Sequence, residues 1–357
     1  MRFGIIVVPI ILSGCKNKSD DYEYVPAEPI VPNHNMKVPE WTTDPTIANA
    51  FSRMLQEQRV SYISIPVKDV VAKCPPTNFK LKAVDVSLGA TLYPSDDAKI
   101  WFLTDKTKLI KTVSPKTTYL EMVWREKAVL SAVEKMDISP RVAPKSSISL
   151  LPGCEIRSYV MDMVPGESLI DYVNNHGSID AATLKKVGKL TLKALEKLHN
   201  TGIVHGDMHR GNIIYNSARN EVKLIDYGRA EAFIDSNGKH LPFKTVKLNP
   251  ELNPLLLSIQ ELKGYAKSRA DDIFRLAEML VTTVGGMEDL IDKRRVRKNG
   301  LIYEEYVLPS ISSLILRKQN KKFAYNVPQY LRDLYNAVVR LDYGDTPDYE
   351  ALSRYFD

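Results

Sequence analysis

The stretch "VHGDMHRGNIIY", Val204 to Tyr215, decides how the chain folds and admits two chemistries. His205 and His209 stand four residues apart, a spacing at which two histidines bind zinc from one face of a helix. Such a helix needs a glutamate directly after the first histidine, and here a glycine stands there instead. Asp207 and Asn212 offer the other chemistry, because phosphoryl transfer needs a carboxylate to orient the acceptor hydroxyl and oxygen ligands for magnesium. The stretch therefore favours phosphoryl transfer over a zinc site.

A second acidic motif follows a short distance along the chain. In "KLIDYGRA", Lys223 to Ala230, the carboxylate of Asp226 comes nineteen residues after Asp207. Apolar, strand-like runs frame both motifs. Two carboxylates and the amide of Asn212 in this arrangement are a specific pattern for holding magnesium beside a reacting phosphate.

A lysine and a glutamate lie farther upstream. Lys111 belongs to "KLIKTV", the third predicted strand, and Glu126 follows fifteen residues later in "REKAVLSAV", which reads as a helix. Taken alone, each residue would be an ordinary surface charge. Their order and spacing ahead of the two acidic motifs give them weight. Glu121 is the competing carboxylate of the same helix.

In this order the motifs resemble the eukaryotic-type protein kinase domain, an α+β, two-lobed fold with a small β-rich N-lobe and a larger helical C-lobe. The resemblance implies that Lys111 contacts the α- and β-phosphates of ATP and that Glu126 is its ion-pair partner. It also implies that Asp207 accepts or orients the proton of the acceptor hydroxyl. Asn212 and Asp226 would then be the ligands of Mg²⁺.

The same resemblance places the nucleotide pocket. In "YVMDMVPGESL", Met161 would line the back of the adenine pocket, and the backbone of Asp162 to Met163 would hydrogen-bond the adenine edge. The loop over the phosphates should hold several glycines, because bare backbone N–H groups must approach the phosphates closely. "VSLGATLYPSDDAKIW" offers only Gly89. This departure favours, as an alternative, a pseudokinase that binds nucleotide without turnover.

Two longer stretches are similar to the casein kinase one and vaccinia-related kinases. They are "LLSIQELKGYAKSRADDIFRLAEML", in which Asp272 would bind the backbone of the catalytic loop, and the C-terminal "YLRDLYNAVVRLDYGDTPDYEALSRYF". His205 would then pack beneath that loop and bond to backbone. His209 replaces the lysine of Ser/Thr kinases, and in this respect the loop looks like those of kinases that phosphorylate small molecules. A histidine can donate a hydrogen bond to phosphate, but its charge depends on pH.

The pattern of apolar residues agrees with two lobes in one kinase-like domain, residues 82–357. Alternating, β-rich segments dominate the N-lobe (82–164), apart from one helix at 118–136. The C-lobe (165–357) is helical. Its segment 181–202 has apolar residues at helical spacing and a glycine at its end, which predicts a helix that stops there. Residues 46–81 would form a small helical extension in front of the domain.

The first 45 residues have a different character. Residues 1–15 form a short apolar run that ends in Leu12-Ser13-Gly14-Cys15, which resembles the lipobox of bacterial lipoproteins. This resemblance predicts an exported protein, anchored to a membrane through a lipidated Cys15 or a signal anchor. A secreted or a cytoplasmic protein are the alternatives. Residues 16–45 are polar and proline-rich, as an extended tether is. The three cysteines form no Cys-x-x-Cys pair, so they cannot supply a thiolate zinc site among themselves. Cys74 and Cys154 are expected to be free thiols, and a disulfide between them is the alternative.

Composition limits the partners. The 357 residues are 44% hydrophobic and 26% charged with a formal net charge of +6, which is globular and only mildly basic. No long basic run predicts nucleic-acid binding. The sequence thus predicts an ATP- and Mg²⁺-dependent kinase of protein serine and threonine. A kinase of small-molecule or glycan alcohols and a nucleotide-binding pseudokinase are the alternatives.

Overall fold

A computed structural model describes the chain from Asn78 to Asp357. Short segments within that range fall outside the description: 82–83, 95–97, 104–106, 114–116, 143–148, 151–156, 236–237, 247, 249–251 and 299–300. The expected signal segment, tether and helical extension up to residue 77 also lie outside the described residues, as do all three cysteines. In the described part, no helix is both long and apolar enough to cross a membrane.

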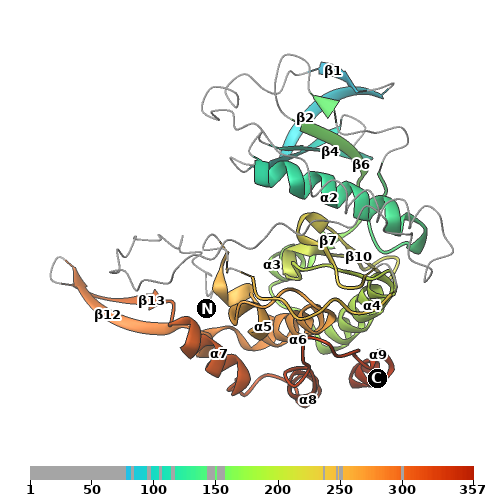
Figure 1. Cartoon of the computed structure of the whole chain (residues 1–357). Coiled ribbons are helices and arrows are strands. Elements are labelled where there is room, and N and C mark those ends of the chain that lie inside the picture. Colours follow the sequence, from blue (N-terminus) through green and yellow to red (C-terminus); the bar gives the residue numbers. More distant parts are fainter. Residues whose placement is uncertain are drawn as a thin grey trace. The chain divides into compact units, whose positions relative to one another are not determined.

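The N-lobe is built on a six-stranded antiparallel sheet in the order β1-β2-β3-β4-β6-β5 (Figure 1). The strands are β1 (Asn78–Leu81), β2 (Val84–Pro94), β3 (Ala98–Leu103), β4 (Lys108–Val113), β5 (Ser149–Leu150) and β6 (Arg157–Asp162). β2 to β6 were expected from the alternating pattern. β1 was not expected. It lies in the segment 46–81, which was predicted to be a helical extension, and it pairs with β2. The sheet therefore begins before residue 82.

Helix α2 (Thr117–Val133) follows β4 and confirms the helix predicted here. Val129, Leu130 and Val133 of its C-terminal half are buried in the hydrophobic core. The helix also lies against η5 (Tyr227–Arg229), the short turn of helix that follows Asp226. α2 thus connects the sheet to the segment that carries the second acidic motif.

The C-lobe is mainly helical, as predicted. Its helices are α3 (Leu169–His176), α4 (Ala181–His199), α5 (Ile259–Leu262), α6 (Arg269–Gly285), α7 (Ile311–Gln319), α8 (Gln329–Val338) and α9 (Tyr349–Ser353). Short strands lie between them: β7 (Glu167–Ser168), β8 (Ile203–Val204), β9 (Ile213–Asn216), β10 (Glu221–Leu224) and β11 (Glu231–Ala232). β10, β9 and β7 form one small sheet, and β11 pairs with β8. These short strands hold the loops that carry the functional residues.

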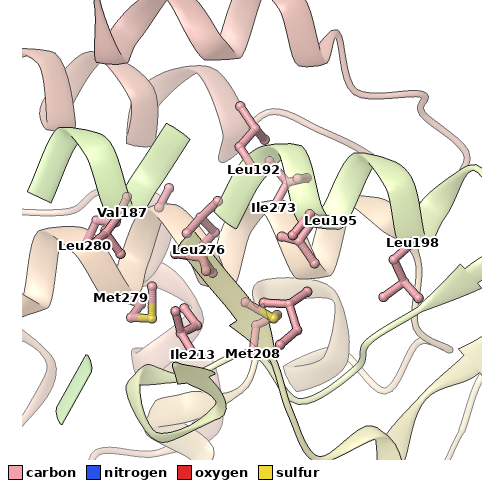
Figure 2. Close-up of a cluster of buried hydrophobic side chains, with 14 of the residues drawn as sticks. Val187, Leu192, Leu195, Leu198, Met208, Ile213, Ile273, Leu276, Met279 and Leu280 are labelled. Atoms are coloured by element: carbon pink, nitrogen blue, oxygen red, sulfur yellow. The ribbon is translucent and has the colours of Figure 1, made fainter. Parts of the chain in front are cut away.

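The core of the C-lobe lies between α4 and α6 (Figure 2). Asp180 caps α4 by accepting from the Thr183 N–H, and the predicted apolar face of α4, which includes Val187, Leu195 and Leu198, is buried. Met208 from the catalytic loop is buried among the same side chains. Because each fully buried Leu or Met stabilises the fold by about 1.5–3 kcal/mol, this core anchors the loop firmly.

A β-hairpin in the C-lobe was not predicted. β12 (Asp292–Lys298) and β13 (Leu301–Val307) form a separate two-stranded antiparallel sheet between η7 (Glu288–Leu290) and α7 (Figure 1). In the described part of the chain, β12 and β13 pair only with each other.

Candidate active site

The loop after β8 takes its shape from a buried aspartate on α6. Asp272 is fully buried, and its two carboxylate oxygens accept from the backbone N–H groups of His205 (2.6 Å) and Gly206 (2.9 Å). Gly206 has a φ of 70°, and a Cβ at this position would lie 2.5 Å from the carbonyl oxygen of Arg229. The loop thus requires glycine here. The predicted role of Asp272 is confirmed.

His205 holds the loop from beneath through its ring nitrogens. Nε2 bonds to the carbonyl oxygen of Ile225 at 3.0 Å, and Nδ1 accepts from the N–H of Asp207 at 3.3 Å. Burial lowers the pKa of His205 despite the nearby carboxylates, so the ring is neutral at pH 7. Both ring nitrogens of His205 are engaged with backbone, so neither is free to bind a metal in this geometry. The structural role predicted for His205 is confirmed.

Asp207 lies between two arginines. Its Oδ1 is 3.5 Å from Nη1 of Arg229 and 3.6 Å from Nη1 of Arg275, and its side chain keeps 20% of its exposure. Arg275 is buried on α6, where Nε and Nη2 bind Glu261 and Nη1 donates to the carbonyl oxygen of Gly206. Asp207 is therefore oriented by two guanidinium groups while it remains accessible to an acceptor.

His209 is neutral and presents one donor. Its Nδ1 accepts from the backbone N–H of Gly211 at 3.1 Å, which fixes the ring proton on Nε2 because a backbone N–H can only donate. Burial lowers the pKa of His209, although Asp207 and Asp226 oppose that effect. The lysine expected at this position is thus replaced by a hydrogen-bond donor without charge at pH 7.

Asn212 ends the loop in η4 (Arg210–Asn212). Its Nδ2 donates to the carbonyl oxygen of Asp207 at 2.9 Å, which leaves the side-chain oxygen as the group that can bind a cation. The backbone N–H of Ile225 donates to the carbonyl oxygen of Asn212 at 3.0 Å and brings the second motif alongside the first. The structure thus holds Asp207, Asn212 and the residue before Asp226 within one hydrogen-bonded arrangement.

Asp226 adopts a left-handed conformation, with φ 62° and ψ 70°. This conformation is rare for a residue with a side chain, and Asp tolerates it better than most. Oδ1 of Asp226 lies 3.1 Å from Nζ of Lys111, and 43% of the side chain is exposed. Desolvation raises the pKa of Asp226, but Lys111 outweighs it, so the net shift is downward and the carboxylate is ionised at neutral pH.

Lys111 joins the two lobes. Its Nζ is 2.6 Å from Oε2 of Glu126 and 3.1 Å from Oδ1 of Asp226. Burial alone would lower the pKa of Lys111, but the two carboxylates together raise it. Burial raises the pKa of Glu126, and Lys111 counteracts it. Lys111 therefore pairs with Glu126, as predicted.

The predicted adenine-binding segment ends β6. Met161 is 6% exposed and belongs to the core. The N–H groups of Asp162 and Met163 already donate to the carbonyl oxygens of Arg141 and Thr107, each at 2.8 Å. If the backbone of Asp162 and Met163 binds the adenine edge as predicted, it would therefore do so through the carbonyl oxygens.

Gly89 lies inside β2 and not in the turn between β2 and β3. The pairing with β3 shifts between Leu88 and Thr91, so Gly89 falls in a β-bulge, where glycine is common. The turn itself, residues 95–97, is outside the described residues and contains no glycine. Gly89 thus shapes the strand, and its predicted contact with ATP stays a prediction.

Four functional residues of the C-lobe escaped the sequence analysis: Arg229, Glu261, Arg275 and His199. His199 is buried at the end of α4, where Nε2 is 2.9 Å from Asp272 and Nδ1 is 2.6 Å from the hydroxyl of Tyr349. Arg275 lies three residues after Asp272 on the same predicted helix, which places it near Asp272 but does not show that it reaches Asp207. His199 and Arg229 carry no such signal, since only the tertiary fold brings them to the site.

The residues present fit a magnesium ion. Asn212 offers an amide oxygen and Asp226 an ionised, partly exposed carboxylate. Magnesium is usually held by one or two such protein groups, with phosphate and water oxygens completing its shell. Two protein ligands therefore suffice here.

A paired lysine on a sheet, a buttressed aspartate and two cation ligands on adjoining loops define a phosphotransferase site of the kinase type. In agreement, residues 106–350 match the protein kinase domain family. The chain belongs to the protein kinase family.

Relatives narrow this placement. The chain is 26% identical over 213 residues to a probable serine/threonine-protein kinase of fowlpox virus, covering 58% of this chain and 66% of that protein. It is 25% identical over 189 residues to the B1 kinase of monkeypox virus, covering 50% and 59%. Both alignments span less than two thirds of the relative. The structure of vaccinia related kinase 3 superposes with a TM-score of 0.63 at 18% identity, over 82% of this chain and 94% of the other, which shows the shared fold.

Proposed function

We propose that this chain is an ATP- and Mg²⁺-dependent kinase of protein serine and threonine, of the type formed by casein kinase one and the vaccinia-related kinases. One contact carries the proposal: Nζ of Lys111 lies 2.6 Å from Oε2 of Glu126 and 3.1 Å from Oδ1 of Asp226. This contact ties the phosphate-binding lysine to the predicted magnesium ligand. The poxvirus relatives, one of them named a serine/threonine-protein kinase, support the choice of acceptor.

Each residue has a role in this mechanism. Lys111 would bind the phosphates of ATP, and Asn212 and Asp226 would hold Mg²⁺, which neutralises charge on the transferred phosphoryl group. Asp207, held by two arginines, would orient the acceptor hydroxyl and accept its proton. His209 would donate a hydrogen bond through Nε2 without adding charge.

The neutral state of His209 favours one second candidate, a kinase of small-molecule or glycan alcohols. Such a kinase would show the same site and differ in its acceptor. A nucleotide-binding pseudokinase finds less support, because all the expected catalytic side chains in the described part are in place. The complete lysine–glutamate–aspartate contact argues for turnover.

Transfer of the γ-phosphate tests the proposal. We expect Mg²⁺-dependent labelling of the chain itself or of generic Ser/Thr proteins, and a loss of about 10²–10⁴-fold in kcat for Asp207→Asn. Asp226→Ala should abolish phosphate transfer, because it removes a predicted ligand of Mg²⁺. His209→Lys should retain transfer to protein. Labelling of a small alcohol but no protein would favour the second candidate, and nucleotide binding that needs no Mg²⁺ and gives no transfer would indicate a pseudokinase.

The N-terminal segment adds a proposal about location. The resemblance of residues 12–15 to a lipobox supports export and a membrane anchor at Cys15. Outside the cytoplasm ATP would have to be supplied, so the anchor and the activity need separate tests. A fatty-acid probe should label the wild-type chain and not Cys15→Ala. Equal labelling of both would refute the anchor.

A further inference from the structure

The catalytic loop carries a neutral side chain, His209, two residues after Asp207. A phosphoryl group in transfer has negative charge spread over three oxygens, and kinases stabilise that charge with metal ions and positive side chains. His209 supplies no such charge at pH 7, because burial lowers its pKa. Lys111 is already paired with Glu126 and Asp226. A further cation beside Asp207 would therefore stabilise the transfer.

Two arginines lie beside Asp207, and their surroundings differ. Arg275 is only 2% exposed, its Nε and Nη2 bind Glu261, and its Nη1 donates to the carbonyl oxygen of Gly206. Its guanidinium group is thus occupied and shielded. Arg229 is 19% exposed, and in the described part of the chain it forms one ion pair, 3.5 Å between its Nη1 and Oδ1 of Asp207. A guanidinium group has five N–H donors, so most of those of Arg229 are available to a ligand.

The backbone of Arg229 is held in place by the C-lobe. Its carbonyl oxygen accepts from Nζ of Lys267 at 2.8 Å, and Gly206, which has no Cβ, leaves room for both groups. Lys267 itself is paired with Glu231 at 3.2 Å, so its charge is compensated locally. Charges that are fixed before a reaction stabilise its transition state most effectively, since they need no reorganisation. η5 therefore presents the guanidinium group of Arg229 from a preorganised position.

Arg229 also lies close enough to His209 to influence its protonation. Burial is the main cause of the lowered pKa of His209, Asp207 and Asp226 oppose it, and the charges of Arg275 and Arg229 add to it. The two features are therefore linked. The arginine that directly follows the second acidic motif helps to keep the loop histidine neutral, and it carries the charge that the histidine lacks.

We propose that Arg229 is a catalytic residue, whose guanidinium group binds the γ-phosphoryl group during transfer and supplies the positive charge that His209 does not. Asp207 accepts the proton of the acceptor hydroxyl as the acceptor oxygen bonds to phosphorus and the bond from phosphorus to the bridging oxygen of ADP breaks. Arg229 forms no covalent bond and acts through hydrogen bonds and charge. This inference rests on the proposed function, since it presumes transfer of a phosphoryl group from ATP.

The first test measures transfer and its rescue in the full chain. Arg229→Gln keeps a hydrogen-bond donor but removes the charge, so we expect kcat to fall by about 10²-fold or more. Adding His209→Lys to the same chain should restore most of the lost kcat, because it returns a cation to the neighbouring position. Arg219→Gln is the matched control. Arg219 is exposed in the turn between β9 and β10, away from the site, and its loss should leave kcat unchanged.

The second test measures binding without turnover. Aluminium fluoride together with Mg·ADP mimics the phosphoryl group during transfer, and calorimetric titration follows its binding. Arg229→Gln should weaken this binding by about tenfold or more and leave the affinity for Mg·ADP alone unchanged, because ADP has no γ-phosphoryl group. Unchanged binding of Mg·ADP also shows that the variant is folded. The same loss in a chain that carries Asp207→Asn would show that Arg229 acts directly and not by orienting Asp207.

The outcomes separate this inference from the proposed function. Transfer by the wild type that persists at the same kcat in Arg229→Gln would support the proposed function and overturn the inference. A loss of aluminium fluoride binding that disappears in the Asp207→Asn chain would make Arg229 a positioning residue and also overturn it. A wild-type chain that binds Mg·ADP with aluminium fluoride through Arg229 but transfers no phosphate would support the inference and contradict the proposed function.

Discussion

Tyr227 directly follows the predicted magnesium ligand Asp226. It is fully buried, and its ring centroid lies 4.8 Å from that of His205, so the ring packs under the catalytic loop. Its hydroxyl has no hydrogen-bond partner among the described residues. The ring therefore stabilises the site, whereas the hydroxyl loses its hydration without compensation.

Tyr227→Phe should raise the free energy of unfolding by about 1–3 kcal/mol, because it removes a buried polar group that has no partner. Urea denaturation would measure the change. Tyr335→Phe is the control: Tyr335 is equally buried, but its hydroxyl donates to the carbonyl oxygen of Lys318 at 2.8 Å. That variant should be destabilised. A loss of stability in Tyr227→Phe would show that its hydroxyl has a partner.

At the scale of residues, the sequence predicted which side chains form the site but not their protonation states. Asp207, Asn212 and Asp226 stand out through their spacing, and the structure brings their segments together. The state of His209 could not be predicted, because it depends on one N–H group of the backbone two residues away. The arginines around Asp207 could not be placed either, since α6 and η5 approach the loop only in the folded chain.

The junction of α5 and α6 is built on two capping boxes that share a buried acid. Asp271 accepts from the backbone N–H and the hydroxyl of Ser268, at 2.7 and 2.8 Å, and from the hydroxyl of Ser258. Burial, with the nearby charge of Glu261, raises the pKa of Asp271 to about 7. The junction therefore contains a carboxyl group that titrates near neutral pH.

The sign of the resulting pH dependence follows from the direction of that shift. The folded state binds the proton of Asp271 more tightly than the unfolded state, where the pKa is the usual 3.8. The group's contribution to stability is thus fully present below pH 3.8 and is lost as the pH rises to about 7, at up to about 1.4 kcal/mol per pH unit. Asp271→Asn is neutral at every pH and should lack this loss.

We therefore expect Asp271→Asn to gain stability relative to the wild type between pH 4.5 and 7, measured by urea denaturation at several pH values. Asp180→Asn is the control, because the hydrogen bonds of Asp180 to Thr183 lower its pKa. Its contribution to stability is present above pH 3.8 and is lost only at lower pH, so the curves of Asp180→Asn and the wild type should stay nearly parallel between pH 4.5 and 7. Parallel curves for Asp271→Asn and the wild type would contradict the prediction.

At the scale of elements, the long periodic segments were predicted, whereas the strands β7, β8 and β11 and the inserted hairpin were not. α4 has a complete apolar face between an N-capping aspartate and a glycine, so its bounds follow from local chemistry. β7, β8 and β11 have only two residues each, too few for a periodic pattern. The β12–β13 hairpin carried only part of a signal: Asn299-Gly300 is typical of a tight hairpin turn, but the run before it, Asp292 to Lys298, is mostly charged.

At the scale of the whole molecule, the lobes share one hydrophobic core, and polar contacts join them at the active site. Nζ of Lys111 reaches Asp226, and Nη1 of Arg125 donates to the carbonyl oxygen of Gly228 at 3.4 Å. The order of β-rich and helical segments predicted the two lobes. It could not predict these contacts, because they join residues more than a hundred positions apart in the chain. α2 and η5 therefore form the connection on which the geometry of the site depends.

The β12–β13 hairpin should be the least stable regular element of the C-lobe. Its strands pair with each other, and isolated two-stranded hairpins are marginally stable in water. Hydrogen exchange read by mass spectrometry should show its amides exchanging through local opening, while those of α4 and α6 exchange only on global unfolding. A variant in which a Gly-Gly linker replaces residues 293–306 should keep the slow exchange of α6. If the hairpin amides exchange as slowly as those of α6, or if the deletion speeds up α6, the hairpin belongs to the cooperative core and the prediction is wrong.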